Sequence, residues 1–237
     1  MAEVLTLRQL AEHLQLSERT LYRLLGRGLL PGFKVGGHWR FRRSVVDYWM
    51  DLRVGRMTAA DFQELEPDWR GAASLSEGLT ESNALLRLGP SFEGPRALIT
   101  ALVGAMDLPP GVSPDALARQ IWDRERVAST ATEGGVAFLH TARWEHRGDR
   151  PSRLLAIGRL DAPMPFGAPD GAGTDVFFLL LAREPRHHLI LLARAAQLCR
   201  DPAVLPGLRS AATGRDVLTL IRAAERRHFH PDATTPS

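Results

Sequence analysis

The chain has 237 residues, of which 44% are hydrophobic and 24% charged, with a formal net charge of +3. These values are ordinary for a globular protein, and the length suits two domains. No apolar run reaches membrane-spanning length, and charged residues interrupt the apolar core that a signal peptide needs, so we expect no membrane contact and a cytoplasmic location. The single Cys199 excludes an internal disulfide and a cysteine-based zinc site, and the eight histidines lack ligand-like spacing, so we expect no metal and no cofactor.

Charge is distributed unevenly along the chain. Residues 1–50 hold eight Lys or Arg against four Asp or Glu, a net of +4, and the rest holds 22 against 23, a net of −1. A basic head on a near-neutral body suggests a nucleic-acid-binding module attached to a second domain. We place the two domains at 1–50 and 75–226, with a linker at 51–74 and a tail at 227–237.

The head has the pattern of a winged helix-turn-helix. Ser17 is a good N-cap for the second helix, and Gly36-Gly37 between two short alternating stretches is a strong hairpin signal. We therefore expect helices at 5–14, 18–25 and 45–50, and strands at 33–35 and 38–41.

Candidate DNA contacts are the polar and basic side chains expected on the exposed side of the second helix and on the hairpin. They are Arg19, Thr20, Tyr22, Arg23, Lys34, His38, Arg40 and Arg42. Arg can contact guanine edges or phosphates, and Thr and Tyr can bond to phosphates. The alternative is that these residues form an ordinary solvated surface.

Residues 4–50 closely resemble the excisionase-like members of the MerR winged-helix family. The resemblance rests on Leu-Ser-x-Arg-Thr-Leu-Tyr-Arg-Leu, Gly-x-Leu-Pro and Lys-Val-Gly-Gly-x-Trp-Arg-Phe. It implies that the head binds duplex DNA. Because one small head contacts few base pairs, a homodimer is a further expectation.

The body predicts an α/β (α+β) sandwich, a mixed sheet with helices on both faces. The continuous apolar run 176–181 is typical of a central strand that is covered on both sides. A strand at 154–160 is followed by an irregular turn at 163–169, and His187-His188 opens a helix. A helix at 94–106 should bury one face, made of Ala97, Leu98, Ala101, Leu102 and Ala105.

The stretch from Arg124 to His140 contains the candidate site. The apolar run 136–139 predicts a buried strand, and His140 is expected at its end, where side chains meet solvent. A neutral imidazole there is a candidate nucleophile, and Arg124 could donate two parallel hydrogen bonds to a phosphate carried on it. On spacing alone, a capping or packing histidine is the competing interpretation.

The order Arg-Glu, Ser-Thr, Gly-Gly and Val-Ala-x-x-His resembles the active-site segment of enzyme IIA domains of the bacterial phosphotransferase system, of the fructose/mannitol and nitrogen-regulatory type. Residues of roughly 75–226 resemble the whole domain. The resemblance implies that His140 accepts a phosphoryl group from a small phosphocarrier protein. It also implies that His188 and Arg124 steady the charge, while Ser129 and Thr130 line the phosphate loop.

Three positions depart from that family. Leu139 stands where Pro is usual, and Ala131 and Glu133 stand where Gly is usual. Three functions therefore stay open. The chain could be a DNA-binding regulator that senses phosphotransferase state through His140, a DNA-binding protein whose second domain contacts a ligand or protein without phosphorylation, or a phosphotransfer protein with an accessory DNA-binding head. In the first and third, His140 would carry phosphate rather than turn over a substrate.

Overall fold

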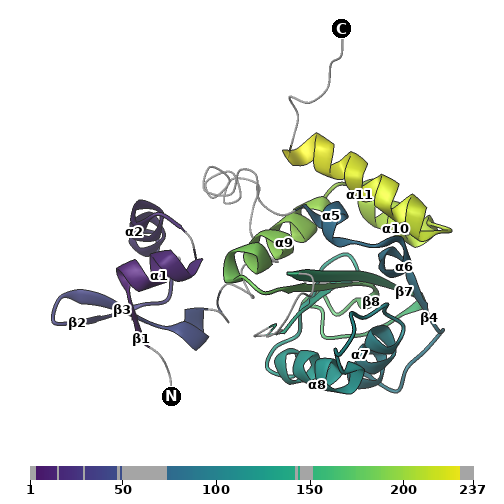
Figure 1. Ribbon diagram of the computed structural model, residues 1–237, viewed down its shortest axis with the longest axis horizontal. Coiled ribbons are helices and arrows are strands. Elements are labelled where there is room, and N and C mark those ends of the chain that lie inside the picture. The colour runs from purple at the N-terminus through teal and green to yellow at the C-terminus, as the bar shows by residue number, and fades with distance from the viewer. Residues whose placement is uncertain are drawn as a thin grey trace, which may run out of the picture.

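The computed structural model describes residues 4–14, 16–28, 30–46, 49, 74–141, 144 and 152–229. Its strands form a three-stranded sheet of order β1-β3-β2 and a five-stranded sheet of order β4-β7-β8-β6-β5 (Figure 1). The predicted linker, apart from Ser74, and the last eight residues of the predicted tail lie outside the described residues. Within the described part of the chain, no helix is long and apolar enough to cross a membrane.

The N-terminal part has the first two predicted helices and the hairpin, and one strand more, while the predicted helix at 45–50 lies partly outside the described residues. Its elements are β1 (Val4–Thr6), α1 (Leu7–Leu14), α2 (Glu18–Gly26), β2 (Phe33–Val35) and β3 (His38–Arg42). Ser17 caps α2 by accepting a hydrogen bond from the Thr20 amide. Gly36 and Gly37 have φ of 57° and 81°, as a tight two-residue hairpin turn requires. The additional strand β1 pairs antiparallel with β3 and places Leu5 opposite the buried Phe41.

The larger part is the predicted α/β sandwich. Its elements are α5 (Leu75–Gly78), α6 (Glu81–Ala84), β4 (Leu86–Leu88), α7 (Pro95–Gly104), α8 (Pro114–Glu125), β5 (Ala131–Thr132), β6 (Val136–Leu139), β7 (Arg153–Pro165), β8 (Gly173–Ala182), α9 (Pro185–Leu198), α10 (Val204–Ser210) and α11 (Gly214–Phe229). Strand β8 is central, antiparallel to β7 and parallel to β6, so the apolar run 176–181 is buried as predicted.

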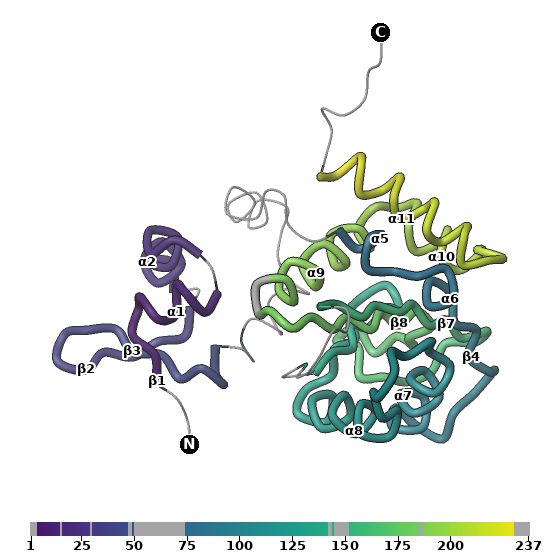
Figure 2. The backbone as a smooth tube through the Cα atoms, viewed as in Figure 1, coloured from purple at the N-terminus to yellow at the C-terminus, as the bar shows by residue number. Residues whose placement is uncertain are grey.

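Helices cover both faces of this sheet, as Figures 1 and 2 show: α7 and α8 on one face, and α9, α10 and α11 on the other. Side chains of β6 alternate between the two cores. Ala137 and Leu139 join the core on the α7 and α8 side, whereas Val136 and Phe138 join the core that contains α9. Because alternation has a period of two, His140 follows Phe138 toward α9.

Two features of the sheet and its helices differ from prediction because tertiary contacts determine them. Helix α7 buries Ile99 and Val103 in addition to Leu98 and Leu102, while the predicted Ala97 and Ala105 are exposed, since the bulkier side chains fill the space above the sheet. Strand β7 continues through a register shift into the predicted irregular turn.

The predicted tail begins too early. Helix α11 continues to Phe229, which is buried, and Arg227 Nη2 lies 2.7 Å from Asp201 Oδ2. Ser74, predicted to end the linker, caps α5 and donates a 2.7 Å hydrogen bond to the buried Glu225 of α11. The larger, C-terminal part therefore extends beyond the predicted range 75–226 at both ends.

Helix α1 lies against α9. One apolar cluster contains residues of both parts, including Leu14 of the N-terminal part and Leu189 of α9. Helix α9 therefore contacts the head on one side and the sheet on the other.

Candidate functional site

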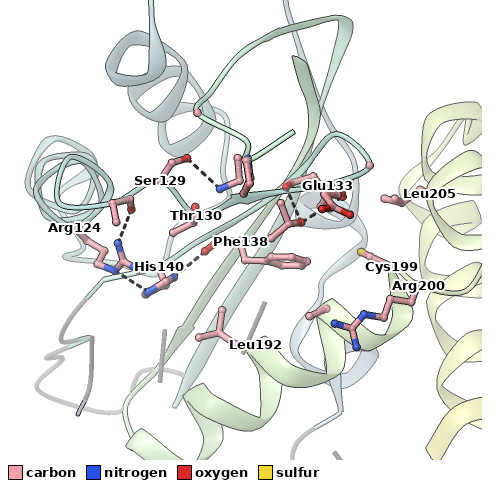
Figure 3. Close-up of a pocket in the computed structure, with 18 residues that line it drawn as sticks. Arg124, Ser129, Thr130, Glu133, Phe138, His140, Leu192, Cys199, Arg200 and Leu205 are labelled. Atoms are coloured by element: carbon pink, nitrogen blue, oxygen red, sulfur yellow. Dashed lines mark hydrogen bonds between the residues drawn. The ribbon is translucent and has the colours of Figure 1, made fainter. Parts of the chain in front are cut away.

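His140 directly follows β6 and is only 2% exposed, so the expectation that it meets solvent is wrong. The physical reason is that α9 crosses this end of the strand and brings the His188 ring to 5.1 Å from the His140 ring, centroid to centroid. His140 nevertheless lines a cavity of about 810 Å³ between the β5–β6 hairpin and α9 (Figure 3). The ring is therefore reached through the cavity.

Two hydrogen bonds hold the His140 ring and define its tautomer. Arg124 Nε lies 3.1 Å from Nε2, and the Phe138 carbonyl oxygen lies 2.7 Å from Nδ1. A guanidinium only donates and a carbonyl only accepts, so Nδ1 carries the proton and Nε2 presents its lone pair. The arrangement requires a neutral imidazole whose nucleophilic nitrogen is Nε2.

Arg124 occupies the last turn of α8 and is 7% exposed. Besides contacting the ring, it donates from Nη1 to the Ala128 carbonyl at 2.9 Å. The buried cation thus connects the end of α8, the start of the following loop and His140. A guanidinium held in this way beside Nε2 is suited to stabilise anionic oxygens on that nitrogen.

Ser129 and Thr130, expected in the phosphate loop, line the cavity, and their hydroxyls donate to other groups of the protein. Ser129 Oγ donates to the Phe166 carbonyl at 2.5 Å and accepts from the Ala131 amide. Thr130 donates from its amide and Oγ1 to the two carboxylate oxygens of Glu125, at 2.8 and 2.7 Å. Both residues therefore shape the loop in this structure.

Glu125 is a site-forming residue that sequence reasoning missed. It is buried at the end of α8 and fixes Thr130 through both oxygens. The signal available in the sequence was its place in the Arg-Glu pair, next to the candidate Arg124. A buried carboxylate must find such donors, because leaving it unpaired would be costly.

The three departures from the resembling family occupy different environments. Leu139 is fully buried in the core on the α7 and α8 side, so its side chain points away from the cavity that His140 lines. Ala131 is buried in the short strand β5, and Glu133 is exposed at the cavity wall. Only Glu133 therefore adds a charge near an incoming phosphoryl group.

Of the two adjacent histidines on α9, His188 faces His140. The other, His187, lies 3.3 Å from Glu184 of the same helix turn. His188 is therefore the histidine of this pair whose ring lies beside that of His140.

Residues of α9, of the segment that follows it and of α10 also line the cavity: Leu192, Ala196, Cys199, Arg200 and Leu205 (Figure 3). Burial raises the pKa of the Cys199 thiol, which disfavours the reactive thiolate. Cys199 is partly buried and packs against the core that contains α9. In the described ranges, no three His, Cys, Asp or Glu side chains are grouped so that they could hold a metal ion.

The candidate DNA contacts lie on α2 and the hairpin, and all but one reach the surface. Thr20 is only 6% exposed, and its Oγ1 lies 2.8 Å from Ser17 Oγ, so its predicted exposure is wrong. The reason is that Thr20 packs under the cap of α2, beside the fully buried Leu21. Arg40 is half-buried, and the others are exposed: Arg19, Tyr22, Arg23, Lys34, His38 and Arg42.

Comparison with known proteins assigns the two parts to families. A helix-turn-helix domain model matches residues 4–51. The model described as phosphoenolpyruvate-dependent sugar phosphotransferase system, EIIA 2 matches residues 89–224. The chain belongs to this EIIA 2 family and carries a helix-turn-helix domain at its N-terminus.

The similar proteins include nitrogen regulatory proteins. One from Bradyrhizobium diazoefficiens is 33% identical over 116 residues, which cover 47% of this chain and 71% of that protein. Another from Pseudomonas aeruginosa is 34% identical over 100 residues, which cover 41% of this chain and 62% of that protein, less than two thirds of its length. The crystal structure of nitrogen regulatory protein IIA-Ntr from Neisseria meningitidis matches with a TM-score of 0.54 at 22% identity, over 62% of this chain and 98% of that one. That likeness shows the fold.

Proposed function

We propose that the protein is a DNA-binding transcriptional regulator that senses phosphotransferase state by accepting a phosphoryl group on His140. The observation that carries the proposal is a neutral imidazole, at the wall of a cavity, whose Nε2 lone pair adjoins a buried arginine. Membership of the EIIA 2 family and the N-terminal helix-turn-helix domain support the two halves of this function.

In the proposed transfer, Nε2 attacks the phosphorus of a phosphorylated carrier protein, and the bond from phosphorus to the carrier breaks as the new N–P bond forms. Nδ1 keeps its proton, and its bond to the Phe138 carbonyl stabilises the positive charge that develops on the ring. Arg124 must move from the ring nitrogen to the phosphoryl oxygens. His188 lies near enough to bond to the same oxygens after a small side-chain movement.

On the head, we propose that α2 and the β2–β3 hairpin contact duplex DNA. Exposed Arg19 and Arg23 on α2 would lie in or along a groove, with Tyr22 (56% exposed) beside them. The hairpin would place Lys34 and Arg42 along the phosphate backbone. Thr20 is not part of this interface because it is buried.

The test of the phosphoryl acceptor is to incubate the full chain with a phosphorylated phosphocarrier protein and to map the modified residue by mass spectrometry. We expect phosphate on His140, none on the His140→Gln variant and unchanged incorporation in the control His187→Gln. Phosphate on another residue, or none on a folded wild-type protein, would rule out His140 as the acceptor.

A second function is favoured by one observation: in the expected phosphate loop, the Ser129 and Thr130 hydroxyls and the Thr130 amide are bonded to Phe166 and Glu125. In this alternative, the cavity beside His140 serves as a contact site for a ligand or protein without phosphorylation. It predicts that wild-type protein stays unmodified by the carrier, while DNA affinity is the same for wild type and His140→Gln.

A further inference from the structure

The β5–β6 hairpin ends in a Gly134-Gly135 turn that forms part of the cavity wall. Gly134 and Gly135 have φ of 87° and 80°, in the left-handed region that favours glycine. Thr132, Glu133 and Gly134 line the cavity that His140 also lines. The position of this turn therefore sets the shape of the space that a phosphoryl donor must enter.

Arg209 of α10 fixes this turn through hydrogen bonds. Its Nη2 donates to the Gly134 carbonyl at 2.7 Å, and its Nε and Nη2 each donate to one oxygen of Asp175, both at 2.7 Å. Asp175 is buried at the start of β8, where its amide and that of Val176 bond to the Gly135 carbonyl. One guanidinium thus connects the turn to the central strand β8, through its hydrogen bond to Gly134 and a bidentate ion pair with Asp175.

The packing around this guanidinium leaves no room for a side chain at Gly135. A Cβ on Gly135 would lie 2.8 Å from Arg209 Nη2 and 3.0 Å from Asp175 Oδ1. Arg209 is itself held, because Arg159 of β7 donates from Nη1 to the carbonyls of Leu208, Arg209 and Ala211 at the end of α10. The hydrogen bond from Arg209 to Gly134 therefore connects the turn to the end of α10, which Arg159 of β7 holds in place.

We infer that Arg209, paired with Asp175, is a positioning residue for phosphoryl transfer to His140, acting by fixing the Gly134-Gly135 turn against the start of β8. The inference rests on the proposed function of His140. Arg209 touches no reacting atom. It fixes the turn that precedes β6, whereas His140 follows that strand, so it acts through the shape of the cavity that both line. Because misplacement of about 1 Å can reduce a rate on the order of 100-fold, we expect its loss to slow transfer by roughly tenfold or more.

The experiment compares two pairs of variants of the full chain. Arg209→Gln removes the cation, and its control, Arg215→Gln, makes the same change at an arginine whose side chain is 79% exposed. Gly135→Ala displaces the guanidinium, and its control, Gly171→Ala, introduces a side chain at a φ of 70° with no atom within 4 Å. The readouts are the rate of phosphate transfer from a phosphorylated carrier, separated into KM and kcat, and amide hydrogen exchange over 131–136.

We expect Arg209→Gln and Gly135→Ala to slow transfer and to speed amide exchange in the turn, while exchange in α7 and α8 stays as in wild type. Both controls should transfer at the wild-type rate. Transfer by Arg209→Gln at the wild-type rate would overturn the positioning role while leaving His140 as acceptor. Slow transfer with unchanged exchange in the turn would overturn it too. If wild type takes up no phosphate at all, the proposed function fails first, and this inference fails with it.

Discussion

Replacing Arg124 by Met is the change that most directly probes the chemistry proposed for His140. The side chain donates to His140 Nε2 at 3.1 Å and to the Ala128 carbonyl at 2.9 Å, and it is almost fully buried. Met keeps an apolar stem of similar length and removes every donor. The variant therefore loses the cation that would stabilise phosphoryl oxygens, and it loses the hydrogen bonds to the buried His140 ring and to the part-buried Ala128 carbonyl.

The expected magnitudes follow from the two hydrogen bonds. A hydrogen bond to a charged group contributes about 1.5–3 kcal/mol, so losing it in the transition state should slow phosphate transfer about 10- to 150-fold. Losing the hydrogen bond to the buried ring nitrogen should lower the free energy of unfolding by about 1–3 kcal/mol. Arg124→Lys should lie between wild type and Arg124→Met, because an ammonium keeps the charge but cannot bond to the ring and the Ala128 carbonyl in the same geometry.

The assay is single-turnover transfer from a phosphorylated carrier, with urea unfolding measured on the same samples and the modified nitrogen assigned by NMR. Phosphate should appear on Nε2 of His140, since Nδ1 carries the proton that Phe138 accepts. A transfer rate in Arg124→Met within twofold of wild type would refute the role of the guanidinium. Phosphate on Nδ1 would refute the tautomer.

Three further predictions concern the head, the end of α11 and the sheet. Arg23→Ala should weaken DNA binding in fluorescence anisotropy and, if Arg23 touches phosphate, reduce the slope of log affinity against log salt by about 0.9. Hydrogen bonds from Arg227, first among several, lower the pKa of Asp201 from 3.8 to about 2. The stability that Asp201 contributes should thus be complete above about pH 4 and lost as pH falls through 2, a dependence that Asp201→Asn should remove in urea unfolding. Gly158→Ala should lower the free energy of unfolding by about 1–3 kcal/mol, because its Cβ would lie 2.6 Å from Leu102.

Each of these three changes has an outcome that contradicts it. Arg8→Ala, on the exposed side of α1, is the control for Arg23→Ala. Equal losses of DNA affinity in the two variants would contradict the proposal that α2 contacts the DNA. Parallel stability curves for wild type and Asp201→Asn between pH 4 and 2 would remove the pH argument. Gly104→Ala meets no atom within 4 Å, so unfolding free energies equal to those of Gly158→Ala would show that packing against Leu102 is irrelevant.

Features encoded in adjacent residues were predictable from the sequence. The Ser17 cap, the Gly36-Gly37 hairpin and the continuous run 176–181 each form the element that their local pattern indicates. Strand β1 was missed because it has only three residues and forms through pairing with β3, more than thirty positions later. The buried side of α7 was misjudged because alanines at helical spacing do not compete with Ile and Val for the core.

The sequence indicated three residues that the structure brings together at the candidate site, but not the contacts that they make. Arg124, His140 and His188 do come together, as the resemblance to enzyme IIA implies. Arg209 was missed because its partner Asp175 lies 34 positions away, and no periodic pattern joins residues at that distance. The burial of His140 was missed because a strand end is exposed only where no helix crosses it, and the position of α9 is a tertiary property.

The central claim is that phosphorylation of His140 changes the affinity of the N-terminal head for DNA. Phosphate adds nearly two negative charges beside α9, which lies between the site and α1. The most direct test measures the dissociation constant for duplex DNA with unmodified and with carrier-phosphorylated full-length protein. We predict weaker binding after phosphorylation, by about five- to 150-fold, the usual range of coupling between two sites. Equal dissociation constants, with phosphate verified on His140, would contradict the account.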